Sequence, residues 1–147
     1  MTGASALVDD ARGGAIATVA MSAVMIAGDR TGFMGEQPPT AITRFALGEA
    51  GVERPSVAAS RIAPFTHLAF GASGGAVFGL LRRLVPGVPS GLLGVGFGLA
   101  VWAVSYKGWI PALGILPPPE HDRPGRPVVM VVAHVVYGLV LARLVRT

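Results

Sequence analysis

The stretch of sequence that decides the fold is residues 127–144, PVVMVVAHVVYGLVLARL, an apolar run interrupted by one histidine, His134. Its length is close to the about 20 residues that a helix needs to cross the hydrocarbon core of a bilayer. The centre of the run, His-Val-Val-Tyr-Gly at 134–138, matches His-Leu-Ala-Phe-Gly at 67–71 in an earlier apolar run. This repeated His-x-x-aromatic-Gly motif is the strongest pattern in the chain, and it suggests a duplicated helix pair.

Three further apolar runs precede this one, and the composition agrees with a membrane location. Of the 147 residues only 14% are charged, whereas soluble domains carry about 25% charged residues. Mean hydropathy is +0.60, and 21 glycines fit membrane helices, in which glycine is common. The sequence therefore predicts an all-α, polytopic membrane protein, a four-transmembrane-helix bundle in a single membrane domain over residues 1–147. The four predicted spans are residues 13–28, 62–81, 91–106 and 127–144.

The longest polar connection, residues 29–61, is predicted to hold one short interfacial helix, with Thr40 as its N-cap. Pro64 is expected near the start of the second span, where its missing N–H costs least. The Arg82-Arg83 pair stands in a very short loop, and we place both termini on the same, cytoplasmic side with it. That side also carries Arg12, Arg143 and Arg146.

Composition excludes several classes of function. The chain has no cysteine, so disulfides, thiolate metal sites and thiol catalysis are excluded. The net charge of +4 comes largely from basic residues beside the apolar runs, where they would meet anionic lipid headgroups. Because no basic face with interleaved aromatic residues is present, nucleic-acid binding is not expected.

Glycines recur every four residues in the predicted spans, which places them along one face of each helix. Small residues at this spacing let membrane helices pack closely, so they are predicted to form the packing seams of the bundle. The packing glycines are Gly71, Gly75, Gly79, Gly94, Gly98 and Gly138. Such seams also allow a homo-oligomer or contact with another membrane protein.

Depth along the helices suggests a polar layer. His67 and His134 lie roughly 8 and 11 Å beyond the starts of two spans that run in the same direction, at about 1.5 Å per residue. Trp102 in the antiparallel third span reaches a similar depth. We therefore expect His67, Trp102 and His134 to form one intramembrane layer.

Three roles for the two histidines stay open. Each imidazole can be hydrogen-bonded within the bundle and serve packing alone. Because histidine titrates near neutral pH, His67 and His134 can instead carry a path for protons, ions or a small solute. As a third alternative, they can ligate a haem from two helices, since imidazole is a common axial ligand.

Other motifs for chemistry are missing. His121 stands in a loop between Glu120 and Asp122, and three adjacent polar residues do not enclose a metal ion. No phosphate-binding loop and no nucleophile elbow occurs. We expect no catalytic residues, no metal and no cofactor, and hence a protein that is not an enzyme.

The motifs together resemble the YagU-like family of small bacterial inner-membrane proteins. The resemblance covers residues 62–146 and rests on His67-x-x-Phe-Gly, Gly94-x-Gly-Phe-Gly-x-x-x-x-Trp102, Trp109-Ile-Pro111 and His134-x-x-Tyr-Gly. It implies a multi-pass protein of the bacterial plasma membrane, without a known molecular activity but with a link to acid tolerance. The expected function is thus structural, interaction or stress-related, with the lipid bilayer as the main partner.

Overall fold

The computed structural model describes residues 3–145, and among these residues it contains helices and turns but no strand. Arg146, which the sequence assigned to the side of the termini, lies outside the described residues. The elements in chain order are α1 (Gly3–Arg30), α2 (Pro38–Glu49), α3 (Pro55–Leu84), α4 (Ser90–Trp102), the π-helical segment η1 (Ala103–Trp109), α5 (Ile110–Ala112), the 3-10 turn η2 (Pro119–His121) and α6 (Arg126–Leu144).

Three helical stretches are long and apolar enough to cross a membrane: Ala4–Arg30, Ser90–Ala112 and Arg126–Leu144. The remaining predicted span, residues 62–81, lies inside α3, which at 30 residues is the longest helix. Its glycines, together with Pro64, Thr66 and His67, lower the hydropathy of this run. The all-helical prediction is confirmed and membrane association is supported, whereas the bundle of four spans is not established by length and composition.

Several helix boundaries differ from the predicted ones. α1 begins ten residues before the predicted run, so Asp9, Asp10 and Arg12 are helical. α3 begins at Pro55, which places Pro64 inside the helix and not near its start. The short helix predicted within residues 29–61 is present as α2, but Gln37 precedes its first turn, and Thr40 is not its cap. The predicted starts of α1 and α3 were too late because charged residues were taken as helix ends, whereas a helix can continue through polar residues beyond its apolar run.

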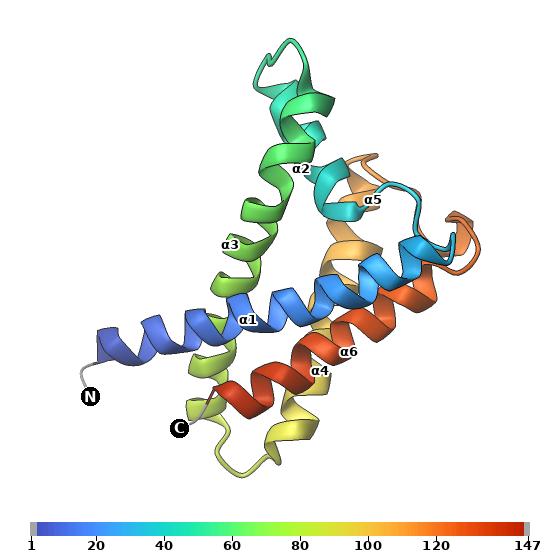
Figure 1. The fold of residues 1–147 in the computed structure, drawn as a ribbon. Coiled ribbons are helices and arrows are strands. Elements are labelled where there is room, and N and C mark those ends of the chain that lie inside the picture. The colour runs from blue at the N-terminus through green and yellow to red at the C-terminus, as the bar shows by residue number, and fades with distance from the viewer. Residues whose placement is uncertain (1–2, 146–147) are drawn as a thin grey trace.

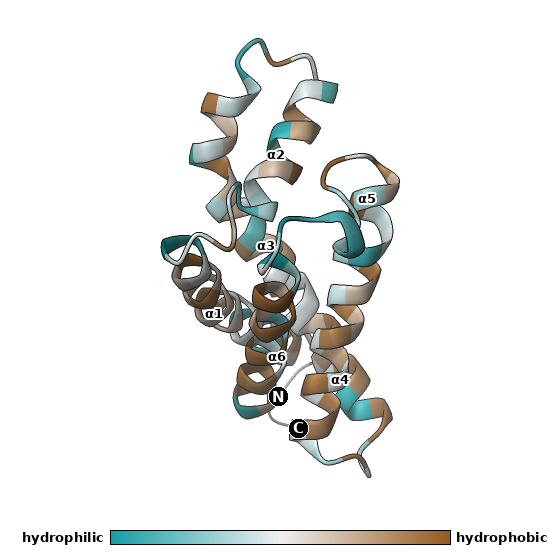
Figure 2. Ribbon diagram, turned by 90° about the vertical axis from the view of Figure 1, so that its right-hand side faces the viewer, coloured by the Kyte–Doolittle hydropathy of each residue, from teal (hydrophilic) through white to brown (hydrophobic). Residues whose placement is uncertain are grey.

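The long helices form two crossing pairs (Figure 1). α1 and α6 lie side by side in opposite directions, α3 packs across α1, and α4 packs across α6. α3 and α4 make few contacts with each other, and α2 packs on the first part of α3. Seen from the side, hydrophobic residues cover much of α1, α4 and α6, while hydrophilic residues gather in the connections (Figure 2).

The crossing of α1 and α3 is built from matched positions spaced four residues apart. A Cβ added at Gly79, Gly75 or Gly71 would clash with Asp10, Gly14 or Thr18, respectively. One turn further along, Ser22 meets His67. In the order of contact, the facing residues are Asp10, Gly14, Thr18 and Ser22 on α1 and Gly79, Gly75, Gly71 and His67 on α3.

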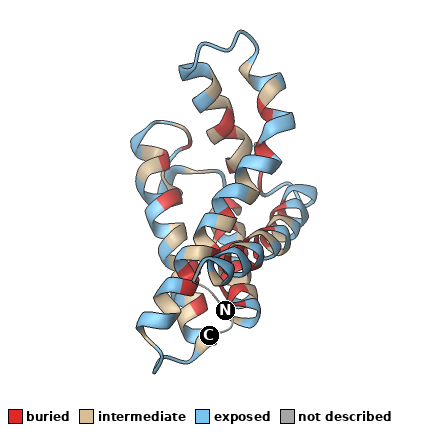
Figure 3. Ribbon diagram, turned by 90° about the vertical axis from the view of Figure 1, so that its left-hand side faces the viewer, coloured by how far each residue is buried: buried red, intermediate tan, exposed pale blue. Residues whose placement is uncertain are grey.

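The crossing of α4 and α6 is also built on close contacts at glycines. A Cβ at Gly138 would clash with the backbone of Gly94, and one at Gly98 would clash with the carbonyl of His134. In both pairs, therefore, the glycine of a His-x-x-aromatic-Gly motif lies at a close helix crossing. Buried residues follow these contact faces, whereas the outer faces of the helices are exposed (Figure 3).

Candidate ligand cavity

A cavity of about 750 Å³ is lined by residues of α1, α2, α3, α4, η1, α5 and α6. Most of the described residues that line it are apolar, and none is Asp, Glu, Lys or Arg. Its polar atoms come from the two histidines of the repeated motif and from a few hydroxyls, including Thr43 and Thr66, whose oxygens are 2.9 Å apart. The cavity is thus an uncharged space to which both predicted histidines contribute.

His134 is buried, with 4% of its surface exposed. Its Nδ1 lies 2.7 Å from the carbonyl oxygen of Met130, one turn earlier in α6. A carbonyl only accepts hydrogen bonds, so Nδ1 must carry the proton in this contact. In the neutral ring, Nε2 is then a lone-pair acceptor, and no described residue donates to it. His134 therefore brings a free acceptor to an apolar wall.

His67 is less tightly held. Its Nδ1 lies 3.4 Å from the hydroxyl oxygen of Ser22 on α1. A hydroxyl both donates and accepts, so this contact is compatible with either tautomer of the imidazole. The Nε2 atom of His67 can consequently serve as a donor or as an acceptor.

Trp102, the third member of the predicted layer, is not among the residues that line the cavity. Its ring packs against Tyr106 with centroids 6.3 Å apart, and its indole nitrogen is buried without a hydrogen-bond partner among residues 3–145. The structure thus brings His67 and His134 to one cavity and places Trp102 outside the lining.

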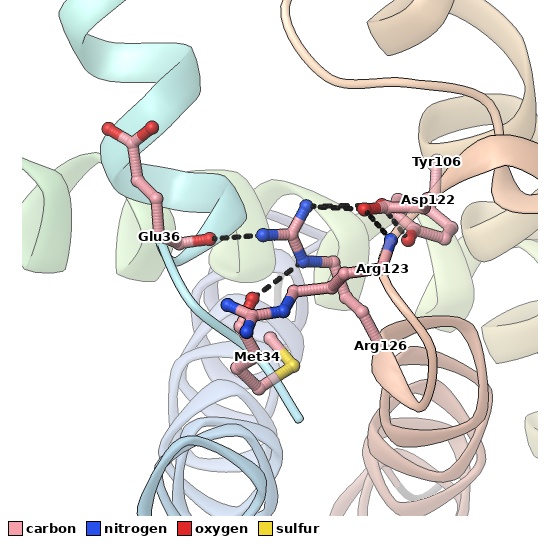
Figure 4. Close-up of polar contacts among 6 residues, drawn as sticks. All are labelled: Met34, Glu36, Tyr106, Asp122, Arg123 and Arg126. Atoms are coloured by element: carbon pink, nitrogen blue, oxygen red, sulfur yellow. Dashed lines mark hydrogen bonds and ion pairs between the residues drawn. The ribbon is translucent and has the colours of Figure 1, made fainter. Parts of the chain in front are cut away.

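A polar cluster near the start of α6 was not predicted from the sequence (Figure 4). The side chains of Arg126 and Asp122 are only 7% and 2% exposed. They form an ion pair in which a guanidinium nitrogen lies 2.8 Å from a carboxylate oxygen. Arg126 also donates to the carbonyl oxygens of Met34, over 2.7 Å, and Glu36, over 3.4 Å. The hydroxyl of Tyr106 donates to Asp122. The sequence shows opposite charges four residues apart at 122 and 126, but it does not show that these side chains are buried.

A second missed pair lies at the opposite end of α1. Asp10 is buried against Gly79, and its carboxylate is 2.8 Å from a guanidinium nitrogen of Arg83. The carboxylate continues the four-residue spacing of Gly14 and Thr18, which is the signal that would have marked it. α1 therefore carries a paired acid within its membrane-length helix.

Outside the membrane-length stretches, an exposed pair holds the start of α2. Arg44 donates two hydrogen bonds of 3.0 Å to the carboxylate of Glu36. The hydrogen bonds to Glu36 raise the pKa of the Arg44 guanidinium, and the negative charge of the Glu36 carboxylate adds to this effect. Since both side chains are largely solvated, the pair positions the connection before α2 and contributes little to stability.

Comparison with known proteins assigns the chain to a family. A family model described as a family of unknown function, DUF6789, matches residues 5–147, and the chain belongs to this family. No curated protein and no solved structure matches the chain. The comparisons give no support to the resemblance to YagU-like proteins or to a bacterial origin.

Proposed function

We propose that this DUF6789 member is a non-enzymatic, multi-pass membrane protein that holds a lipid-soluble ligand in its apolar cavity. The observation that carries the proposal is the cavity itself, which is large, uncharged and lined by two histidines. A space of about 750 Å³ falls within the range of roughly 300–1,000 Å³ that is typical of small-molecule sites.

The surroundings of the cavity support entry from lipid. Phe70, Val77 and Val104 line it, yet they are 54%, 56% and 68% exposed. Contiguous exposed apolar surface is unfavourable in water and marks a contact with a membrane or a ligand. In a bilayer these side chains would meet acyl chains, so a hydrophobic molecule would reach the histidines without crossing water.

The proposal includes α3 as a fourth span, in a plasma membrane and with both termini on the cytoplasmic side. Apolar side chains such as Phe65, Phe70 and Leu80 are exposed along residues 62–81, which suits lipid. Arg82 and Arg83 follow this stretch directly, where they would meet headgroups. The small-residue seams are engaged within the chain, so an oligomer would have to use other faces.

The topology is testable because the chain has no cysteine, and any single introduced thiol is therefore the only one. We would introduce cysteine at Glu53, Val88 or Glu120 and label intact cells or oriented vesicles with an impermeant maleimide. If α3 spans, the thiols at 53 and 120 react from one side and the thiol at 88 from the other. Labelling of 53 and 88 from the same side would contradict the fourth span. Val132→Cys, exposed on α6, serves as the lipid-facing control that stays unlabelled.

Ligand binding can be tested by native mass spectrometry of protein released from lipid nanodiscs. Wild-type protein should retain a bound lipid-soluble molecule. Ala100→Trp places a large ring in the cavity and should remove the bound mass, because Ala100 lines the cavity. Ala103→Trp is the matched control one turn away, since Ala103 does not line it, and should retain the mass. Equal retention in both variants would contradict the proposal.

A further inference from the structure

We infer that the cavity ligand is a neutral, lipid-soluble phenol or quinol, whose hydroxyl donates a hydrogen bond to Nε2 of His134. This inference rests on the proposed function, because it names the ligand chemistry of the same cavity.

Nε2 of His134 accepts no hydrogen bond from the described residues. The bond from Nδ1 to the carbonyl of Met130 fixes the proton of His134 and leaves Nε2 as a lone pair on a residue that lines the apolar cavity. A polar atom in an apolar site gains from a hydrogen bond, so a molecule that supplies a donor is favoured over one that supplies only apolar surface. An alkane-like guest would leave this atom unmet, whereas a hydroxyl would satisfy it.

The lining of the cavity is rich in aromatic rings. Four aromatic side chains from four different elements face the cavity: Phe70, Phe97, Trp109 and Tyr137. Aromatic groups prefer offset-stacked or edge-to-face contacts with another ring, and such contacts add to the gain from burial. A hydroxyl carried on an aromatic ring therefore fits this lining better than one on a flexible chain. A phenolic hydroxyl is also a better donor than an aliphatic one.

The imidazole of His67 can meet a second oxygen of the ligand. Because the contact with Ser22 permits either tautomer, the Nε2 atom of His67 can accept from a hydroxyl or donate to a carbonyl. A quinol has a second oxygen across its ring, and the corresponding quinone has a carbonyl there. His67 is thus able to meet the second oxygen in either form, while His134 selects for the hydroxyl.

The lining of the cavity favours an uncharged ligand. No described residue in the lining carries a positive charge, so an anionic ligand would find no counter-ion there. Haem, the alternative that the sequence left open, has two carboxylates, and the lining favours an uncharged molecule over it. Haem binding is therefore one of the outcomes that the following experiment separates.

The experiment uses a matched ligand pair that differs in one donor: 4-decylphenol and its methyl ether, 4-decylanisole. Binding to the full chain in detergent is followed by the fluorescence of Trp109 after Trp102→Phe removes the only other tryptophan. Affinities are corrected for the partition of each compound into micelles. The phenol should bind roughly 5–10 times more tightly than the ether, the effect of one net hydrogen bond. In His134→Phe this preference should disappear, while the ether should bind as before.

A second measurement does not depend on the variant folding. With ¹⁵N-labelled histidine, addition of the phenol should shift the Nε2 resonance of His134, and addition of the ether should not. If neither compound binds the wild-type chain, the proposed cavity function fails. If both bind equally, the cavity stands and the phenol inference is overturned. A Soret band after expression with added haem, lost in the His67→Ala, His134→Ala double variant, would overturn it in favour of haem.

Discussion

The hydroxyl of Tyr137 donates a hydrogen bond of 2.8 Å to the carbonyl oxygen of Gly71. The aromatic residue of one His-x-x-aromatic-Gly motif is thus bonded to the glycine of the other. The bond is buried and joins α6 to α3, so it links the two crossing pairs. His67 and His134 each lie one helical turn before this link, on the sides of their helices that line the cavity.

Loss of this link should weaken the join between the crossing pairs. Tyr137→Phe removes the hydroxyl and leaves the Gly71 carbonyl without that donor, so we expect a loss of about 1 kcal/mol in the free energy of unfolding. Unfolding in detergent by increasing SDS, followed by circular dichroism, measures the loss. Val132→Ala on the exposed face of α6 is the control, and an equal loss there would contradict a specific role for the bond.

Close approach of α1 and α3 should make Gly71 intolerant of even one methyl group. A Cβ at Gly71 would clash with the hydroxyl of Thr18. This hydroxyl donates a hydrogen bond of 2.8 Å to the carbonyl oxygen of Gly14. Gly71→Ala should therefore cost about 1–3 kcal/mol, as overpacking does. Gly96→Ala is a matched control in α4, because a Cβ there meets open space. It should be neutral or slightly stabilising, since alanine is the better helix former. Thermal melting in detergent would show both effects, and equal shifts would refute the packing argument.

The buried pair of Arg126 and Asp122 should be the most sensitive charged site. Arg126→Met leaves the carboxylate of Asp122 and the carbonyl of Met34 without their cationic donor. We expect a loss of about 3 kcal/mol, because breaking a buried pair strands the other charge. Arg143→Met, which changes an exposed arginine of the same helix, should alter stability by less than about 0.5 kcal/mol. Similar losses in the two variants would contradict a specific stabilising role of the buried pair.

The pH response of the connection before α6 can be predicted from Glu120. Hydrogen bonding to its own backbone N–H lowers the pKa of Glu120 below its ordinary value of 4.5, and the hydrogen bond and charge of Lys107 lower it further. Because the folded pKa is the lower one, its favourable contribution is present above pH 4.5 and is lost as pH falls through the folded pKa. NMR titration of the side chain should show the lowered pKa. In Lys107→Met the value should rise only part of the way, and a full return would mean that the lysine dominates.

The sequence was most informative about which residues are helical and which faces are packed. Apolar runs located the cores of α1, α4 and α6, and four-residue spacing marked Gly71 and Gly138, which lie at helix crossings. Periodicity shows which face of a helix turns inward, but it does not name the helix that covers that face. For this reason the two crossing pairs, with α3 and α4 largely apart, were not foreseen.

The polar residues show more clearly which contacts the sequence does not predict. Asp10 lies before the predicted span 13–28, since charged residues usually end an apolar run, yet it is buried and its partner Arg83 comes from a distant part of the chain. Likewise, burial of Asp122 and Arg126 depends on carbonyl oxygens from the connection between α1 and α2. Such pairings arise only from the tertiary fold, and the sequence alone gives no distance between them. Trp102 was placed by depth along its helix, which says nothing about the direction its ring takes.

The packing of α1 against α6 has a consequence for the order of assembly. α1 can meet α3 as soon as both have been synthesised, and their matched positions need nothing from the rest of the chain. α6 follows the other described helices in the chain, and only after its synthesis is the other face of α1 covered and the Gly71 carbonyl reached by Tyr137. Until α6 has been made, that face of the first crossing pair is uncovered, and the lining of the cavity is incomplete without His134 and Tyr137.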